Sequence, residues 1–179
     1  KVMKFKFAFW GHGANLQDDP NSMKNRFRYF FLNQSDCWFA YTNGVRNFLI
    51  KRGVNNNKIT VVDNAIDTLN LKLQYDNLSI SEVDNLKNEM GVNSDNVAIY
   101  CGGIYKEKRI DFLIEASVII KENISDFHLV FVGAGPEAYR VKEASETYDW
   151  IHYVGSKFGA ERVPYFKMSE LFLMPGLVG

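Results

Sequence analysis

Two short apolar runs in the second half of the sequence are each followed at once by glycines. Such a run is typical of a buried parallel strand, and glycine after it lets the chain turn tightly. A helix predicted after each turn would point free N–H groups and the positive end of its dipole at the turn, which favours an anion. The pattern predicts two strand–turn–helix units that hold phosphate, as in nucleotide-binding α/β proteins. The runs are residues 97–101 and 127–132, and the glycines are Gly102, Gly103, Gly133 and Gly135.

The same alternation of strands and helices extends over most of the chain and predicts parallel sheets. The predicted class is therefore α/β, with Rossmann-like parallel sheets and flanking helices. The first set has strands at residues 5–10, 37–41 and 59–62, with helices at 22–34 and 42–51. The second set has strands at residues 97–101, 127–132, 150–154 and 171–174, with helices at about 108–122, from 136, and at 160–167.

A polar stretch without a clear period, residues 68–78, separates the two sets and is predicted to be a linker. We expect a partial first lobe over residues 1–72, a linker and helix over 73–95, and a partial second lobe over 96–179. Because the chain opens on Lys1 and stops without a closing helix, we expect both lobes to be incomplete.

Serines and a glycine mark the ends of the helix that follows the predicted linker. Ser79 or Ser81 caps its start, Ser81-Glu-Val-Asp84 approximates a capping box, and Gly91 ends it.

The helix predicted at residues 22–34, with Asn21 or Ser22 as its cap, carries a strongly aromatic face. Basic residues flank this face, so it could lie on a membrane surface. Packing against the predicted sheet is the favoured alternative. The apolar positions are Met23, Phe27, Phe30 and Phe31, and the flanking basic residues are Arg26 and Arg28.

Composition excludes several functions. Lysines and arginines balance aspartates and glutamates at 21 each, so no nucleic-acid partner is expected. Cys37 and Cys101 lie in apolar runs and are interpreted as reduced, and no apolar run approaches the length of a membrane span, so a cytoplasmic protein is expected. His128 and His152 are interpreted as core or edge residues, and no cluster has metal-ligand spacing.

Five segments together resemble the GT-B fold glycosyltransferases of the glycosyl transferases group 1 family. The resemblance covers most of the chain from His12 to Pro175, with the end of the N-terminal lobe and the first half of the donor-binding lobe. The segments are Asn64-Ala-Ile-Asp67, the turn from Gly102 to Lys108, Val132-Gly-Ala-Gly-Pro-Glu137, Val154-Gly-Ser156 and Leu173-Met-Pro175.

The resemblance implies roles for particular residues. Lys108 matches the family lysine that neutralises the donor diphosphate in a Gly-Arg…Glu-Lys-Gly turn, but Gly103 stands where the arginine is expected. Arg109 is the candidate to compensate for that missing guanidinium. The remaining implied site residues are Gly102 and Gly103 at the floor, Gly133, Gly135 and Pro136 below the donor, Val154 and Gly155 near the nucleobase, and His12 facing the cleft as a second catalytic residue.

The resemblance also implies the reaction. A UDP- or GDP-sugar would donate its sugar to a glycan or lipid-linked acceptor in polysaccharide or glycoconjugate biosynthesis, mostly with retention and without a bound metal, at times at the cytosolic face of a membrane. The family's paired-glutamate motif would follow Gly179, so we expect this chain alone not to turn over.

Two alternatives stay open. Gly133-Ala-Gly-Pro-Glu-Ala138 fits the dinucleotide fingerprint of NAD(P) or FAD oxidoreductases, although residues 154–156 lack the carboxylate that would bind a ribose. A non-catalytic nucleotide- or partner-binding module is favoured by Gly103 and by the missing acidic motif.

Overall fold

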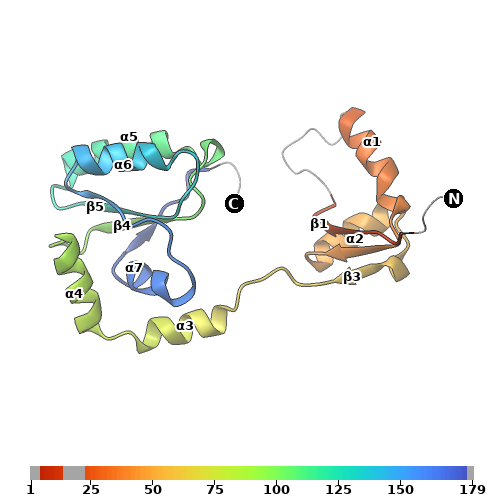
Figure 1. Cartoon of the computed structure of the whole chain (residues 1–179), viewed down its shortest axis with the longest axis horizontal. Helices are drawn as coiled ribbons and strands as arrows, with labels where there is room; N and C mark the ends of the chain where they lie inside the picture. Colours follow the sequence, from red (N-terminus) through yellow and green to blue (C-terminus); the bar gives the residue numbers. More distant parts are fainter. Residues whose placement is uncertain (1–4, 14–22, 177–179) are drawn as a thin grey trace. The chain divides into compact units, whose positions relative to one another are not determined.

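The computed structural model describes residues 5–13 and 23–176, without the side chains of Lys24 and Arg28. The chain divides into two compact units, Lys1–Ile66 and Asp67–Gly179 (Figure 1). Both contain parallel sheets with flanking helices, which confirms the predicted α/β class. The predicted cap at Asn21 or Ser22 lies outside the described residues.

The first unit is a three-stranded parallel sheet with the strand order β1-β2-β3. Its core forms where Trp38 and Ala40 of β2 meet Leu49 of α2, all three buried. The Thr42 side chain accepts a hydrogen bond from the Val45 N–H and caps α2. The elements are β1 (Ala8–Gly11), α1 (Met23–Phe31), β2 (Cys37–Ala40), α2 (Asn43–Lys51) and β3 (Ile59–Val61), with single 3-10 turns at Leu32–Gln34 and Asn56–Lys58.

Helix α1 does not pack its aromatic face against the sheet, which was the alternative favoured from the sequence. The predicted apolar face is turned outward, with Met23 85% and Phe27 69% exposed, whereas Asn25 is fully buried. Asn25, Tyr29 and Leu32 are spaced by four and three residues, so they form the neighbouring stripe of the helix, which faces inward. The prediction from hydrophobicity that the face of Met23, Phe27, Phe30 and Phe31 packs inward was therefore wrong.

The second unit is a four-stranded parallel sheet with the strand order β6-β5-β4-β7. Helices α5 and α6 cover one face, and α4 and α7 cover the other (Figure 1). The strands are β4 (Val97–Cys101), β5 (His128–Val132), β6 (Ile151–Tyr153) and β7 (Leu171–Phe172). The helices are α3 (Thr68–Asn77), α4 (Ile80–Met90), α5 (Ile110–Asn123), α6 (Ala138–Thr147) and α7 (Val163–Lys167), with 3-10 turns at Lys106–Lys108 and Gly159–Arg162.

Alternate residues of the central strands serve opposite faces of this sheet. In β4, Ala98 and Tyr100 pack toward α5 and α6, while Val97 and Ile99 pack toward α4 and α7. Because both faces are covered, the strand reads as a continuous apolar run rather than as an alternating one. This is why the sequence located β4 and β5 closely.

Residues 68–78 are not a linker, because most of them form helix α3. The Asp67 carboxylate accepts a hydrogen bond from the Asn70 N–H at 2.9 Å and caps the helix start. Lys167 of α7 donates to the carbonyls of Tyr75 and Leu78, at 2.7 Å each. Since α3 contains no buried residue, it lacks the apolar period by which a helix is recognised. The boundary predicted at residue 72 falls inside this helix, whereas the units divide after Ile66.

The caps of α4 were predicted in part. Ser79 is the N-cap, and it forms a capping box with Glu82 rather than the Ser81 to Asp84 box expected from the sequence. Gly91 ends the helix in the left-handed conformation, with φ +70°, as predicted.

Candidate functional site

The predicted site residues of the second unit meet at one edge of its sheet. Parallel strands place all their carboxyl ends on the same side, where open α/β sheets bind ligands. Three of the described turns carry these residues. Gly102 and Gly103 follow β4, Gly133, Gly135 and Pro136 follow β5, and Val154 and Gly155 follow β6. The chain after β7 reaches the same edge at Gly176.

Hydrogen bonds join these turns to one another. The N–H of Gly102 donates to Val132 O and that of Ile104 donates to Ala134 O, both at 2.9 Å. The N–H of Gly133 donates to Gly155 O at 2.8 Å. The three turns therefore form one bonded layer, and these three N–H groups are engaged within it rather than turned to a ligand.

Two of the glycines are required by this packing. A Cβ added at Gly133 would lie 1.9 Å from Gly102 O, and one added at Gly135 would lie 2.1 Å from Ile104 O. Both distances fall far below any real contact, and backbone cannot swing aside as a side chain can. The glycines allow one turn to approach another, whereas the sequence analysis attributed them to tight turns that hold phosphate.

Tyr100 is a site-forming residue that the sequence analysis missed. Its hydroxyl donates a 2.6 Å hydrogen bond to Gly103 O, and the residue is fully buried at the end of β4. Burial raises the pKa of Tyr100 to about 12, so the hydroxyl stays protonated and keeps its donor role. A tyrosine in an otherwise small and aliphatic strand, two residues before a glycine pair, was the available signal.

Lys108 is buried in the turn that follows β4, with 4% of its surface exposed. It ends the 3-10 turn Lys106–Lys108, whose first hydrogen bond runs from the Lys108 N–H to Tyr105 O at 2.9 Å. The side chain lies beside Gly176, where an added Cβ would be 3.0 Å from Lys108 Cδ. A lysine this buried is rarely a solvated surface charge.

The side chains of Arg109 and Lys108 lie in different surroundings although the two residues are adjacent in the sequence. Its guanidinium lies 4.5 Å from the centre of the Phe112 ring, and the residue is exposed. It has φ +54°, in the left-handed region that favours glycine, and it stands where the quoted family turn has its last glycine.

Arg109 lines a polar pocket of about 210 Å³ between the starts of α5 and α6. Arg140 in this pocket forms ion pairs with Glu137 and, at 3.2 Å, with Asp111. Lys108 does not line the pocket. The pair of cations predicted from the sequence therefore serves two different places.

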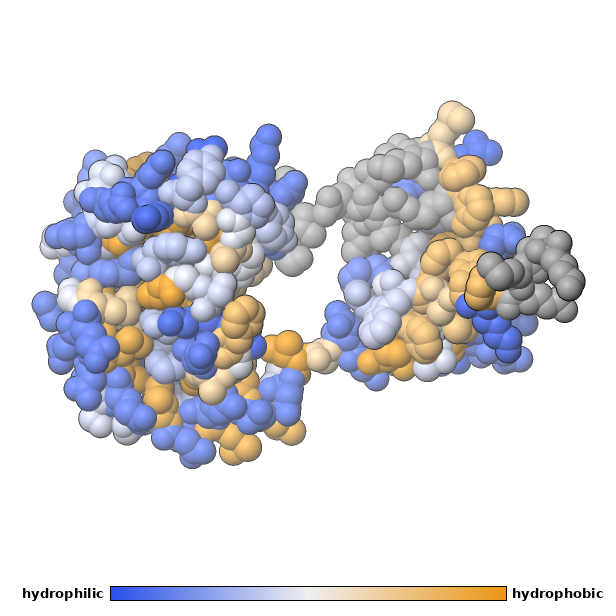
Figure 2. All heavy atoms as spheres, viewed as in Figure 1, coloured by the Kyte–Doolittle hydropathy of each residue, from blue (hydrophilic) through white to orange (hydrophobic). Residues whose placement is uncertain are grey.

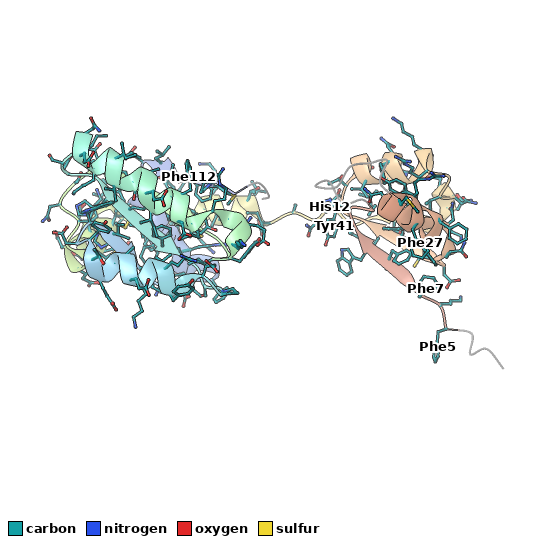
Figure 3. The ribbon with its side chains drawn as sticks, turned by 90° about the horizontal axis from the view of Figure 1, so that it is seen from above. Phe5, Phe7, His12, Phe27, Tyr41 and Phe112 are labelled. Carbon is teal, nitrogen blue, oxygen red and sulfur yellow. The ribbon has the colours of Figure 1, made fainter. Side chains whose placement is uncertain are left out.

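His12 belongs to the first unit and follows β1 directly. Its ring meets that of Tyr41, which follows β2, at a centroid distance of 4.7 Å and in a T-shaped arrangement (Figure 3). The two residues share the carboxyl edge of the first sheet. Tyr41 was not singled out from the sequence, because an aromatic residue after a short strand carries no distinctive pattern.

Within residues 5–13 and 23–176 no group of three or more His, Cys, Asp or Glu side chains could hold a metal ion. In the same described part, no helix has both the length and the apolar character needed to cross a bilayer.

Parallel α/β units with glycine turns gathered at one strand edge are the architecture of GT-B fold glycosyltransferases, and solved structures of that class match this chain. Anabaena HepE, solved in complex with UDP and glucose, matches with a TM-score of 0.62 and 17% identity over 93% of this chain. WaaG, a glycosyltransferase involved in lipopolysaccharide biosynthesis, matches with a TM-score of 0.60 and 14% identity over 88% of this chain.

The sequence matches the family described as glycosyl transferases group 1 over residues 82–178, and the chain belongs to that family. The alpha-monoglucosyldiacylglycerol synthase of Acholeplasma laidlawii is 29% identical over 121 residues, which cover 65% of this chain. The chain spans 30% of that enzyme, 45% of HepE and 44% of WaaG. Family membership favours the glycosyltransferase prediction over the oxidoreductase alternative.

Proposed function

We propose that the second unit binds the diphosphate of a nucleotide sugar, and that the protein transfers the sugar to a glycan or lipid-linked acceptor. Lys108 carries the proposal. It is the buried cation of the edge where the turns of β4, β5 and β6 meet, and a cation held there neutralises charge that develops on a leaving diphosphate. UDP or GDP is the proposed nucleotide, and HepE was solved with UDP.

Calorimetric titration of this chain with UDP and with GDP tests the proposal. Lys108→Met removes the charge and keeps most of the buried stem, so we expect it to weaken binding by about 1 to 3 kcal/mol. Lys142→Met is the matched control, because Lys142 is an exposed lysine of α6 with only a loose contact to Glu146, at 3.9 Å. Equal affinity of the two variants would contradict the role of Lys108.

We propose that the transfer retains the anomeric configuration, as the family resemblance implies. We also propose that it needs no metal, since Lys108 and the dipoles of α5 and α6 would supply positive charge. In a transfer assay on the full-length protein, NMR of the product reports the anomer and EDTA tests the metal. Inversion of the anomer would overturn the proposed retention, and loss of activity in EDTA would overturn the proposed metal independence.

A lipid-linked acceptor at the cytosolic face of a membrane is favoured by the surface of the first unit. Residues 1–66 hold ten basic and four acidic residues, a net charge of +6, whereas residues 67–179 hold eleven and seventeen, a net charge of −6. The overall balance therefore conceals a basic unit. Exposed hydrophobic residues gather along α1 of this unit (Figure 2), and the Acholeplasma relative is named for a glucosyldiacylglycerol.

Vesicle sedimentation tests this contact. Vesicles with anionic lipid should retain the chain, neutral vesicles should retain less, and Phe27→Ser with Phe30→Ser should reduce binding severalfold. Ile119→Ser on α5 is the control, since Ile119 is similarly exposed but lies in the acidic unit. An equal loss in the control would show that the contact is not specific to α1.

A nucleotide-binding module without catalysis is the second candidate, favoured by Gly103 at the position where an arginine is expected. Both candidates bind UDP or GDP. Only the glycosyltransferase consumes a nucleotide sugar when an acceptor is present, so a transfer assay on the full-length protein distinguishes them.

A further inference from the structure

The ring of Tyr105 occupies the space next to Gly103. A Cβ added at Gly103 would lie 2.7 Å from Cε1 and 3.1 Å from Cδ1 of that ring. Gly103 does not have a positive φ, so its backbone would accept a side chain. The obstacle to a side chain at position 103 is therefore the Tyr105 ring and not the local conformation.

The same ring contacts Lys108. The ammonium Nζ lies 5.3 Å from the centre of the Tyr105 ring, within the range of a cation–π interaction. The backbones are tied as well, because the Lys108 N–H donates to Tyr105 O at 2.9 Å. Tyr105 thus contacts Lys108 through both its ring and its carbonyl, and Tyr105 itself is exposed.

A third contact limits where the Lys108 stem can lie. An added Cβ at Gly176 would be 3.0 Å from Lys108 Cδ and 3.1 Å from Lys108 Cα, which is already close. The stem therefore has the chain after β7 as a neighbour, and its tip has the Tyr105 ring. Displacing the ring would remove this cation–π contact of the tip while leaving the stem packed.

We propose that Tyr105 is a positioning residue for Lys108, and that the absence of a side chain at Gly103 is what allows the ring to take that place. Gly103 and Tyr105 act as one unit: the small residue makes room for the ring, and the ring orients the ammonium toward the edge where the turns meet. The effect of Tyr105 on ligand binding rests on the proposed function, the binding of a nucleotide diphosphate at that edge. The contact between Tyr105 and Lys108 does not depend on that proposal.

The structural part is tested by NMR without any ligand. The ε-methylene protons of Lys108 should show a ring-current shift that Tyr105→Phe preserves and Tyr105→Ala removes. Gly103→Ala should also reduce the shift, because the new methyl group displaces the ring. Gly102→Ala is the matched control, since its Cβ would meet only Tyr100 at an ordinary 3.5 Å. An unchanged Lys108 signal in Tyr105→Ala would overturn the proposal.

The functional part is tested by UDP titration of the Tyr105 and Gly103 variants. Tyr105→Ala should weaken binding about fivefold, the loss expected for one cation–π contact, and Tyr105→Phe should stay within about twofold of the unaltered chain. Gly103→Ala should weaken binding in the unaltered chain but not further in the Tyr105→Ala background. Additive losses would contradict the idea of a single unit.

The two failures are distinguishable. If the unaltered chain does not bind UDP, the proposed function fails, whatever the Lys108 signal shows. If the chain binds UDP and Lys108→Met weakens binding while Tyr105→Ala does not, the proposed function stands and the role of Tyr105 is refuted.

Discussion

Gly133 and Gly102 meet backbone to backbone, because a Cβ on Gly133 would lie 1.9 Å from the Gly102 carbonyl oxygen. The turn after β5 therefore closes directly onto the turn after β4. Anything that separates them also moves Gly103, Tyr105 and Lys108.

Gly133→Ala should destabilise the second unit by about 3 kcal/mol or more, because the methyl group forces the two turns apart. Urea denaturation measures the loss. Gly11→Ala in the first unit is the control for backbone strain alone, since Gly11 has φ +146°, close to the +149° of Gly133, and open space around its Cβ position, and it should cost about 1 to 2 kcal/mol. Similar losses in both variants would show that strain, and not the close approach, requires the glycine.

Tyr100→Phe should lower the free energy of unfolding by about 1 to 2 kcal/mol, because the buried Gly103 carbonyl loses its 2.6 Å hydrogen bond. UDP binding should weaken too, since the floor of the site is no longer fixed. Tyr139→Phe, at an exposed position of α6, should change neither property. Retained stability in Tyr100→Phe would argue that water or another donor replaces the hydroxyl.

Arg109 holds a left-handed backbone conformation, with φ +54°, at the start of α5. Of the two variants that remove its guanidinium, Arg109→Gly should therefore be about 1 kcal/mol more stable than Arg109→Ala. Thermal unfolding of the pair measures this difference. If Arg109 serves only as an exposed cation beside Phe112, both variants should bind UDP as the unaltered chain does. A loss of affinity shared by both variants would support the compensating role predicted from the sequence.

Acidification should destabilise the second unit through His128, the first residue of β5, and His152, the middle residue of β6, whose rings are joined by a 2.9 Å hydrogen bond between Nδ1 of His128 and Nε2 of His152. Burial and the neighbouring His128 lower the pKa of His152 to about 4, and burial also lowers the pKa of His128. Since the unfolded chain binds protons more readily, stability should be complete above about pH 6.5 and fall toward pH 4, by about 1 to 2 kcal/mol after allowance for solvent screening.

The unfolding temperature measured against pH tests this effect. His152→Gln should flatten the pH dependence, while His12→Gln should leave it unchanged, because His12 lies in the other unit. A flat profile in the unaltered chain would contradict the assignment.

Much of the second unit was predictable from sequence because its central strands are buried on both faces. Continuous apolar runs such as residues 97–101 followed by glycine leave few alternatives. Helix α3 was not predictable in the same way, because polar bonds from Lys167 and the Asp67 cap hold it, and such bonds leave no apolar period.

The place of the candidate site in the fold was predictable from the sequence, but the contacts that shape it were not. Topology alone brings the turns of β4, β5 and β6 to one edge, so the gathering of Lys108 and the glycines there was predictable, while their part in binding a nucleotide stays a prediction. Three features of the site depend on contacts between atoms of different turns, and such contacts leave no local sequence pattern. They are the need for glycine at position 133, the hydrogen bond of the Tyr100 hydroxyl, and the different surroundings of Arg109 and Lys108. For α1, the inward stripe contains the polar residue Asn25 while the more apolar stripe is exposed, so hydrophobicity did not identify the inward face.

The most direct test of the central claim is the mapping of UDP on the ¹⁵N-labelled chain by amide chemical shifts. Binding at the proposed site predicts changes gathered at residues 102–109, 133–137 and 154–156, with little change at His128, His152 or the first unit. Absence of any shift at millimolar UDP, or shifts centred on the amino ends of the strands, would contradict the account.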